Sequence, residues 1–65
     1  MRPSIYSRVR YLGVANGQER INPGDIGYII EDYGDGNFEV EFCRADGTTG
    51  AQAVIAESDL ELAEN

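Results

Sequence analysis

The stretch from Pro23 to Phe42 constrains the fold of this chain more than any other part of the sequence. Pro23-Gly24 suits a type II turn, because proline presets the first corner and glycine supplies the positive φ of the second. The apolar run at residues 26–30 is typical of a strand, and residues 34–37 have the composition of a tight turn. Residues 38–42 then alternate between apolar and acidic side chains. The sequence therefore predicts an antiparallel β-hairpin.

Three further segments, residues 6–12, 48–55 and 59–62, also have the composition and alternation of β-strands. Turn signals separate the strands, and the short connection at residues 56–58 suits a single 3₁₀ turn. No long helical pattern, repeat or linker interrupts them. We therefore predict one all-β domain over residues 1–65, a small five-stranded antiparallel barrel whose closure leaves no exposed sheet edge.

Two details of this barrel follow from single residues. Gly27 breaks the alternation of the second strand and predicts a bulge or a bend there. In such a barrel the last strand lies beside the first, so Asp59 and Glu61 should face outward next to Arg8 and Arg10. Opposite charges on neighbouring strands stabilise a sheet by roughly 0.2–1 kcal/mol per pair. We expect these four charges to offset one another.

The charge of the chain is acidic and unevenly distributed. The formal net charge is -7, and the sequence contains no lysine and no histidine. Residues 1–20 carry four arginines and one acid, whereas residues 21–65 carry eleven acids and a single base, Arg44. An acidic surface disfavours nucleic acid and anionic membrane, which have the same sign, and favours a basic protein partner. The alternative is that the acid only keeps a small protein soluble.

The residue types argue against catalysis. Without histidine or lysine, Ser-His-Asp, Cys-His and Schiff-base mechanisms are unavailable. Cys43 is the single cysteine, so it forms no internal disulfide, and we expect it to be an inert residue at a strand end. No apolar run follows Met1, and none approaches the roughly 20 residues that span a bilayer. The sequence predicts a cytoplasmic protein that is not an enzyme.

Carboxylate groups are the remaining candidates for chemistry. Glu39 and Glu41 lie about 7 Å apart along a strand, a spacing that could serve acid–base chemistry on sugars only within a substrate cleft. Asp32, Asp35 and Asn37 cluster at one turn but do not match the spacing of a calcium loop. We therefore expect no catalytic residue, no metal and no cofactor.

The candidate binding surface consists instead of acidic side chains on the second to fourth strands and their turns, opposed only by Arg44. Like charges held this close cost stability, and a basic partner relieves that cost. Glu31 and Asp32 are alternatives for the outer face of their strand. The candidate partner-binding residues are Glu31, Asp32, Asp35, Glu39, Glu41 and Asp46.

The run from Asn22 to Glu31 resembles the GDxGxVV strand of small SH3-like barrels. Examples are nitrile hydratase β-subunit-like domains, the photosystem I accessory barrel and KOW-type domains. The continuation at residues 38–42, 46–49 and 59–60 is similar to a family of small bacterial barrels classified as a domain of unknown function. This resemblance covers residues 5–62 and implies a five-stranded antiparallel SH3-like barrel.

The resemblance also implies a role. Such families often occur beside toxin-like genes, which implies an immunity protein or antitoxin that occludes a basic toxin such as a nuclease. The alternative is a general protein-interaction or accessory-subunit barrel, as in the photosystem and nitrile hydratase relatives. The chain departs from the pattern in a longer first loop, with an apparent insertion at residues 15–18, where a partner-specific contact could differ.

Overall fold

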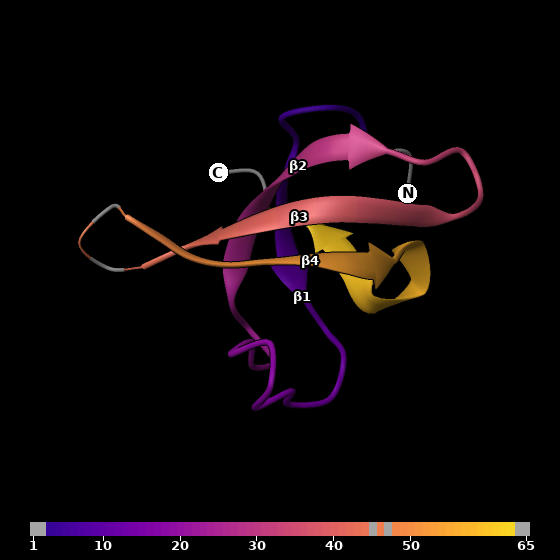
Figure 1. Ribbon diagram of the computed structural model, residues 1–65. Helices are drawn as coiled ribbons and strands as arrows, with labels where there is room; N and C mark the ends of the chain where they lie inside the picture. Colours follow the sequence, from indigo (N-terminus) through magenta and orange to yellow (C-terminus); the bar gives the residue numbers. More distant parts are fainter. Residues whose placement is uncertain (1–2, 45, 47, 64–65) are drawn as a thin grey trace.

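A computed structural model describes residues 3–44, 46 and 48–63 of the chain. These residues form a single antiparallel sheet of five strands in the order β4-β3-β2-β1-β5 (Figure 1). The prediction of a small all-β, barrel-like fold is confirmed. The elements are β1 (Arg8–Tyr11), β2 (Ile26–Asp32), β3 (Asn37–Cys43), β4 (Thr49–Ala56), the 3₁₀ turn η1 (Glu57–Asp59) and β5 (Leu60–Leu62).

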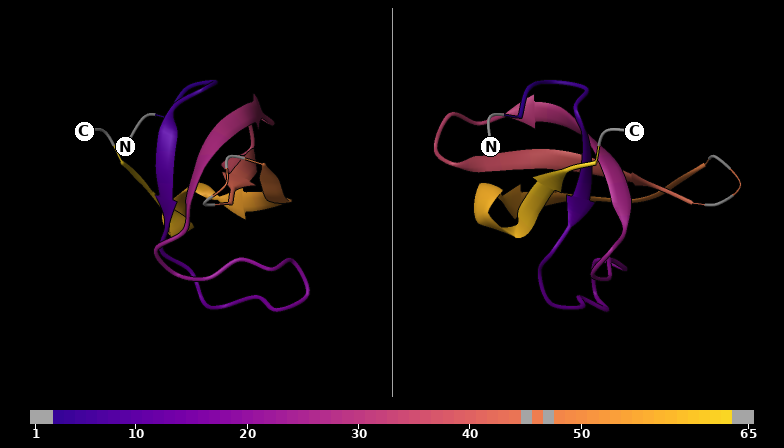
Figure 2. Two further views of the ribbon diagram at one scale, coloured as in Figure 1. Left: turned by 90° about the vertical axis from the view of Figure 1, so that its left-hand side faces the viewer. Right: turned by 180° about the vertical axis from the view of Figure 1, so that it is seen from behind.

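The sheet coils so that its last strand returns to its first (Figure 2). As predicted, β5 pairs with β1, and Arg10 lies opposite Glu61 in their register. The two edge strands, β4 and β5, are consecutive in the chain and are joined by η1. However, within the described residues β4 pairs with β3 and not with β5. The expected complete closure is therefore wrong, and the barrel keeps an open edge along β4.

The core forms from the inward faces of all five strands. Phe38, Val40 and Phe42 are buried on β3, as their alternation predicts, and the ring of Phe42 meets that of Tyr11 edge to face at 6.1 Å. Burial of these apolar side chains is the main favourable contribution to folding. The buried cluster consists of Val9, Tyr11, Ile21, Ile29, Phe38, Val40, Phe42, Ala53, Ile55 and Leu60.

The turns follow the sequence chemistry closely. Gly24 has a φ of 96°, and the N–H of Asp25 donates to the carbonyl of Asn22 at 3.0 Å, which confirms the turn predicted at Pro23-Gly24. Gly34 and Gly36 have φ values of 77° and 92°, conformations that glycine adopts without steric cost. The β2–β3 turn therefore depends on both glycines.

Of the two alternatives predicted for Gly27, a bulge or a bend, the bulge is wrong. The register between β2 and β3 shifts between Ile29 and Glu31, which places the irregularity at Ile30. Gly27 is instead a point of close approach: a Cβ there would lie 2.7 Å from the carbonyl oxygen of Glu41 and 2.9 Å from Val40. The missing side chain lets β2 curve tightly against β3.

The C-terminal elements differ from expectation by one residue. The 3₁₀ turn covers Glu57–Asp59 rather than residues 56–58, so Asp59 belongs to the turn and not to the last strand. Leu60 is buried as its alternation predicts, but Leu62 is exposed because it lies beyond the core at the sheet edge.

Candidate functional site

The outer surface of β2, β3 and β4 carries three glutamates in adjacent positions. Glu39 and Glu41 point outward from β3, on the face opposite the buried side chains. Glu31 of β2 is the direct register partner of Glu39. Directly opposed residues of an antiparallel pair point to the same face, with their Cβ atoms about 4.5–5.5 Å apart. The carboxylate side chains of Glu31 and Glu39 are therefore direct neighbours. Of the two alternatives on β2, the structure thus places Glu31 beside Glu39.

Apolar and aromatic side chains surround these glutamates. Tyr28 lies opposite Glu41 and Val54 lies opposite Glu39 in the strand registers. Tyr28, Tyr33 and Val54 are 39%, 50% and 56% exposed. Aromatic side chains such as Tyr28 and Tyr33 are enriched at protein interfaces. We call this surface the acidic face; it consists of Tyr28, Glu31, Tyr33, Glu39, Glu41 and Val54.

One hydrogen bond organises the acidic face. The Tyr33 hydroxyl donates to the Glu39 carboxylate at 2.6 Å. This bond raises the pKa of Tyr33 above its ordinary 10.0, and the negative charges of Glu39 and Glu31 act in the same direction. The tyrosine thus holds the Glu39 carboxylate beside Glu31, where like charges would otherwise push the two side chains apart.

The three candidate aspartates, Asp32 at the end of β2 and Asp35 and Asp46 in turns, accept hydrogen bonds from backbone N–H groups. Asp32 accepts a hydrogen bond from the N–H of Gly34 at 2.8 Å, and Asp35 accepts one from the N–H of Asn37 at 3.0 Å. These Asx contacts stabilise the β2–β3 turn locally. The two carboxylates therefore lie at one end of the acidic face, next to Glu31.

Asp46 lies at the other end of β3, in the β3–β4 turn (Figure 1). Its carboxylate accepts hydrogen bonds from the hydroxyl and the N–H of Thr48, at 2.7 and 3.0 Å. These bonds lower the pKa of Asp46 below its usual value. The structure thus brings Glu31, Glu39 and Glu41 together and places Asp32 and Asp35 at their border, while Asp46 lies beyond the other end of β3.

The base expected to oppose this surface lies elsewhere. Arg44 covers Gly50, where a Cβ would lie 2.8 Å from the arginine Cγ atom. Arg44 also lines a pocket of about 300 Å³ together with Arg20 and Asp25 of the β1–β2 connection. Two of the few basic residues therefore gather around one pocket at the β3–β4 turn end of the sheet.

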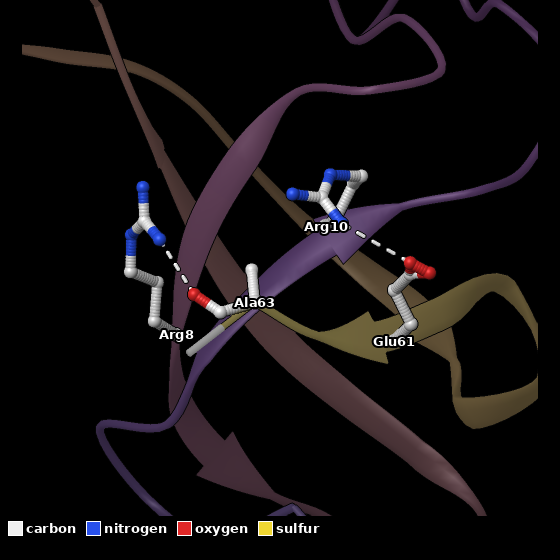
Figure 3. Close-up of polar contacts among 4 residues, drawn as sticks. All are labelled: Arg8, Arg10, Glu61 and Ala63. Carbon is white, nitrogen blue, oxygen red and sulfur yellow. Dashed lines mark hydrogen bonds and ion pairs between the residues drawn. The ribbon is translucent and has the colours of Figure 1, made fainter. Parts of the chain in front are cut away.

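Opposite charges do meet on the first and last strands. Arg10 of β1 and Glu61 of β5 form an ion pair at 3.1 Å, as predicted (Figure 3). Arg8 donates to the carbonyl oxygen of Ala63. Asp59, predicted beside the arginines, lies in η1, where its carbonyl accepts the N–H of Leu12 at 2.8 Å. The offset of charge in this region therefore rests on the Arg10–Glu61 pair that the structure shows.

The sequence interpretation missed the aromatic part of the acidic face. It named no tyrosine among the candidate binding residues, whereas Tyr28 and Tyr33 lie exposed among the glutamates. The signal was present: Tyr28 lies between buried Gly27 and Ile29, and alternation alone places it outward. Val54 follows from alternation in the same way, between buried Ala53 and Ile55.

The described residues contain no cluster of histidine, cysteine, aspartate and glutamate arranged to hold a metal ion. Cys43 is an exposed free thiol at the end of β3. None of the helices among the described residues is long and apolar enough to span a membrane. The structure defines a small β-barrel-like domain with a charged and aromatic surface.

A family model matches most of this domain. Residues 6–62 match the family described as a domain of unknown function, DUF4926, and the chain belongs to that family. The resemblance to a barrel family of unknown function is thereby confirmed. Searches among curated proteins and among solved structures find no match to the chain.

Proposed function

We propose that this chain is a non-catalytic immunity protein or antitoxin that binds a basic protein, such as a nuclease toxin, through its acidic face. The observation that carries the proposal is the juxtaposition of Glu31 and Glu39 in the β2–β3 register, with Glu41 next along β3. Like charges in directly opposed positions destabilise a sheet. A cationic partner surface changes this local cost into favourable contacts in the complex.

The composition of the acidic face supports a protein partner rather than a small ligand. Tyr28 and Tyr33 provide rigid contact area of the type that is enriched at interfaces. The glutamates around them would steer a basic partner electrostatically, toward association rates of about 10⁸–10⁹ M⁻¹s⁻¹ at low salt. Asp32 and Asp35 extend the negative surface at the β2–β3 turn.

The absence of catalysis is part of the proposal. The sequence lacks histidine and lysine, which removes the commonest bases and amine nucleophiles. Inhibition by occlusion needs only a complementary surface. A cytoplasmic location also belongs to the proposal, because a toxin that cleaves nucleic acid in its own cell is neutralised there.

The proposal expects the gene of a basic protein beside the gene of this chain, and that protein is the partner for the test. We expect its expression to arrest growth, co-expression of this chain to restore growth, and the purified proteins to form a complex that weakens as salt is added. The double variant Glu39→Gln/Glu41→Gln should weaken the complex by about tenfold or more, since hydrogen bonds to charged groups contribute about 1.5–3 kcal/mol each.

The matched control is Glu57→Gln/Glu61→Gln, which changes the net charge equally, from -7 to -5, at sites away from the acidic face. It should retain nearly the full affinity. Equal losses in both double variants would show that only overall charge matters and would contradict the proposal. Stable assembly into an enzyme complex, without any toxin to inhibit, would instead favour an accessory-subunit barrel.

A further inference from the structure

Strand β4 forms one edge of the sheet and, within the described residues, pairs with β3 alone. Opposed residues of an antiparallel pair alternate between those that exchange backbone hydrogen bonds and those that do not. The N–H of Glu57 donates to the carbonyl of Gly36 at 2.9 Å, and the β3–β4 register continues from this pair. Counting in steps of two from Glu57, Ile55, Ala53 and Ala51 are the residues of β4 that bond to β3.

The residues between them direct their backbone groups the other way. Gln52 and Val54 each turn one N–H and one C=O toward the open edge, and Ala56 turns its N–H there, because its C=O caps η1. The described residues outside the sheet make no backbone hydrogen bond to Gln52 or Val54. An unpaired strand edge of this kind is a template for another strand.

A groove of about 370 Å³ lies beside this edge. Residues 53–56 line it together with Glu19 and Ile21 of the β1–β2 connection, and with Tyr11 and Asp59. The lining thus combines apolar side chains with two carboxylates. On the other side of β4, the glutamates of β3 occupy the acidic face, so the open edge runs between two negative surfaces.

We propose that an extended segment of a basic partner adds to the sheet as a sixth strand along β4. The segment would alternate, with lysine or arginine above Val54 and Gln52, toward Glu39 and Glu41, and apolar side chains in the groove toward Ile21. Charge complementarity selects this occupant. A second copy of the chain is disfavoured, because it would bring another seven negative charges to the same edge. The inference rests on the proposed function for the sign of the partner's charge and adds the mode of binding.

The test uses a short capped peptide of alternating lysine and valine as the probe. In an antiparallel pairing, the lysines that share a face with Val54 also turn their N–H groups toward β4. Methylation of the backbone nitrogens of the lysine residues should therefore weaken binding by about tenfold or more, because hydrogen bonds are lost and the methyl groups block the approach of the strand. N-methylation of the valines should leave the affinity nearly unchanged. In a parallel pairing the sensitive set is the valines.

Three results would overturn the inference: no binding of the unmethylated peptide, equal effects of the two methylated sets, or equal binding of a peptide with the lysines and valines in separate blocks. The last would indicate attraction by charge alone. Amide hydrogen exchange gives a second readout. Binding should protect Gln52, Val54 and Ala56, while Ala53 and Ile55 are already protected in the free chain.

A variant of the chain checks the same point. Val54→Pro removes an N–H of the open edge and leaves the bonds to β3 intact, a position where proline is tolerated. It should lose peptide binding, while Val54→Thr, which keeps the N–H, should retain it. If peptide binding fails but Glu39→Gln/Glu41→Gln still weakens the toxin complex, the sixth strand is wrong and the proposed function stands. Should Val54→Pro not fold, the methylated peptides decide.

Discussion

Two strand pairs of this sheet, β1–β5 and β2–β3, carry opposite arrangements of charge. Where β1 meets β5, Arg10 lies directly opposite Glu61 and the two form an ion pair. Where β2 meets β3, Glu31 lies directly opposite Glu39, and Glu39 accepts a hydrogen bond from Tyr33. Both are outward pairs on antiparallel strands, so the geometry is alike and the residue types alone differ.

The difference shows which strand pair favours the stability of the free domain. A chain of this length has little stability to spare. Cross-strand charges of opposite sign help it, and the first and last strands use them. The like pair on β2 and β3 works against it, together with exposed Tyr28 and Tyr33. The second region is therefore the better candidate for a surface whose charges are satisfied by another molecule.

The largest effect is expected at β2, the strand that connects the two regions through its pairing with β1. Gly27 pairs with Val9 on one side and with Phe42 on the other. Gly27→Ala places a Cβ 2.7 Å from the Glu41 carbonyl, which belongs to a backbone that cannot move freely. We expect a loss of about 1–3 kcal/mol in the free energy of unfolding, measured by urea denaturation.

Gly17→Ala is the matched control, because nothing lies within 4 Å of the position of its Cβ. It should leave the stability nearly unchanged. A single cooperative transition that shifts for Gly27→Ala would show that both charge regions belong to one folding unit. A Gly27→Ala variant as stable as the parent would mean that β2 does not approach β3 as closely as described.

A smaller effect separates the two regions by its sign. Glu31→Lys converts the like pair with Glu39 into an opposite pair and should raise the free energy of unfolding by about 0.5–1 kcal/mol. Glu61→Lys places two cations opposite each other at Arg10 and should lower it by a similar amount. Thermal unfolding at low salt measures both.

The same two variants bear on binding. Glu31→Lys should stabilise the free domain while weakening the complex with a basic partner, whereas Glu61→Lys should destabilise the domain with little effect on the complex. If both variants destabilise the domain equally, the contrast between the regions does not hold. Added salt should reduce both stability effects, since both are exposed and screened.

Alternation and turn chemistry predicted most of the fold. The β2–β3 hairpin, the turn at Pro23-Gly24 and the β1–β5 neighbours all follow from local pattern and strand order. The role of Gly27 could not be predicted, because a glycine within a strand gives the same sequence signal for a bulge and for a close approach of two backbones. Closure of the barrel was not predictable either, since it depends on long-range curvature. Ile21, in a polar connection, contributes to the core without any periodic signal.

The candidate site was predictable only in part, because alternation assigns strand residues to a face but does not show which residues lie opposite one another. Alternation fixes which side of β3 carries Glu39 and Glu41, but it breaks down at the irregularity near Ile30, so the choice between Glu31 and Asp32 needed the register. Turn residues have no alternation, and Asp32 and Asp46 proved to hold backbone N–H groups. Charge counts identified the acid; only the strand pairing shows which carboxylates meet.

The smallest effect concerns the hydrogen bond that holds the acidic face together. The Tyr33 pKa lies above 10.0 because its hydroxyl donates to Glu39, so the bond stabilises the fold while the phenol is protonated. That stabilisation is complete below pH 10.0 and is lost as the pH rises through the Tyr33 pKa. Glu39→Gln should lower the Tyr33 pKa toward 10.0, as measured by NMR titration of its ring. Glu61→Gln, on β5, should leave the Tyr33 pKa unchanged. A shift equal to that of Glu39→Gln would show that net charge is the cause, and that the hydrogen bond from Tyr33 does not organise the acidic face.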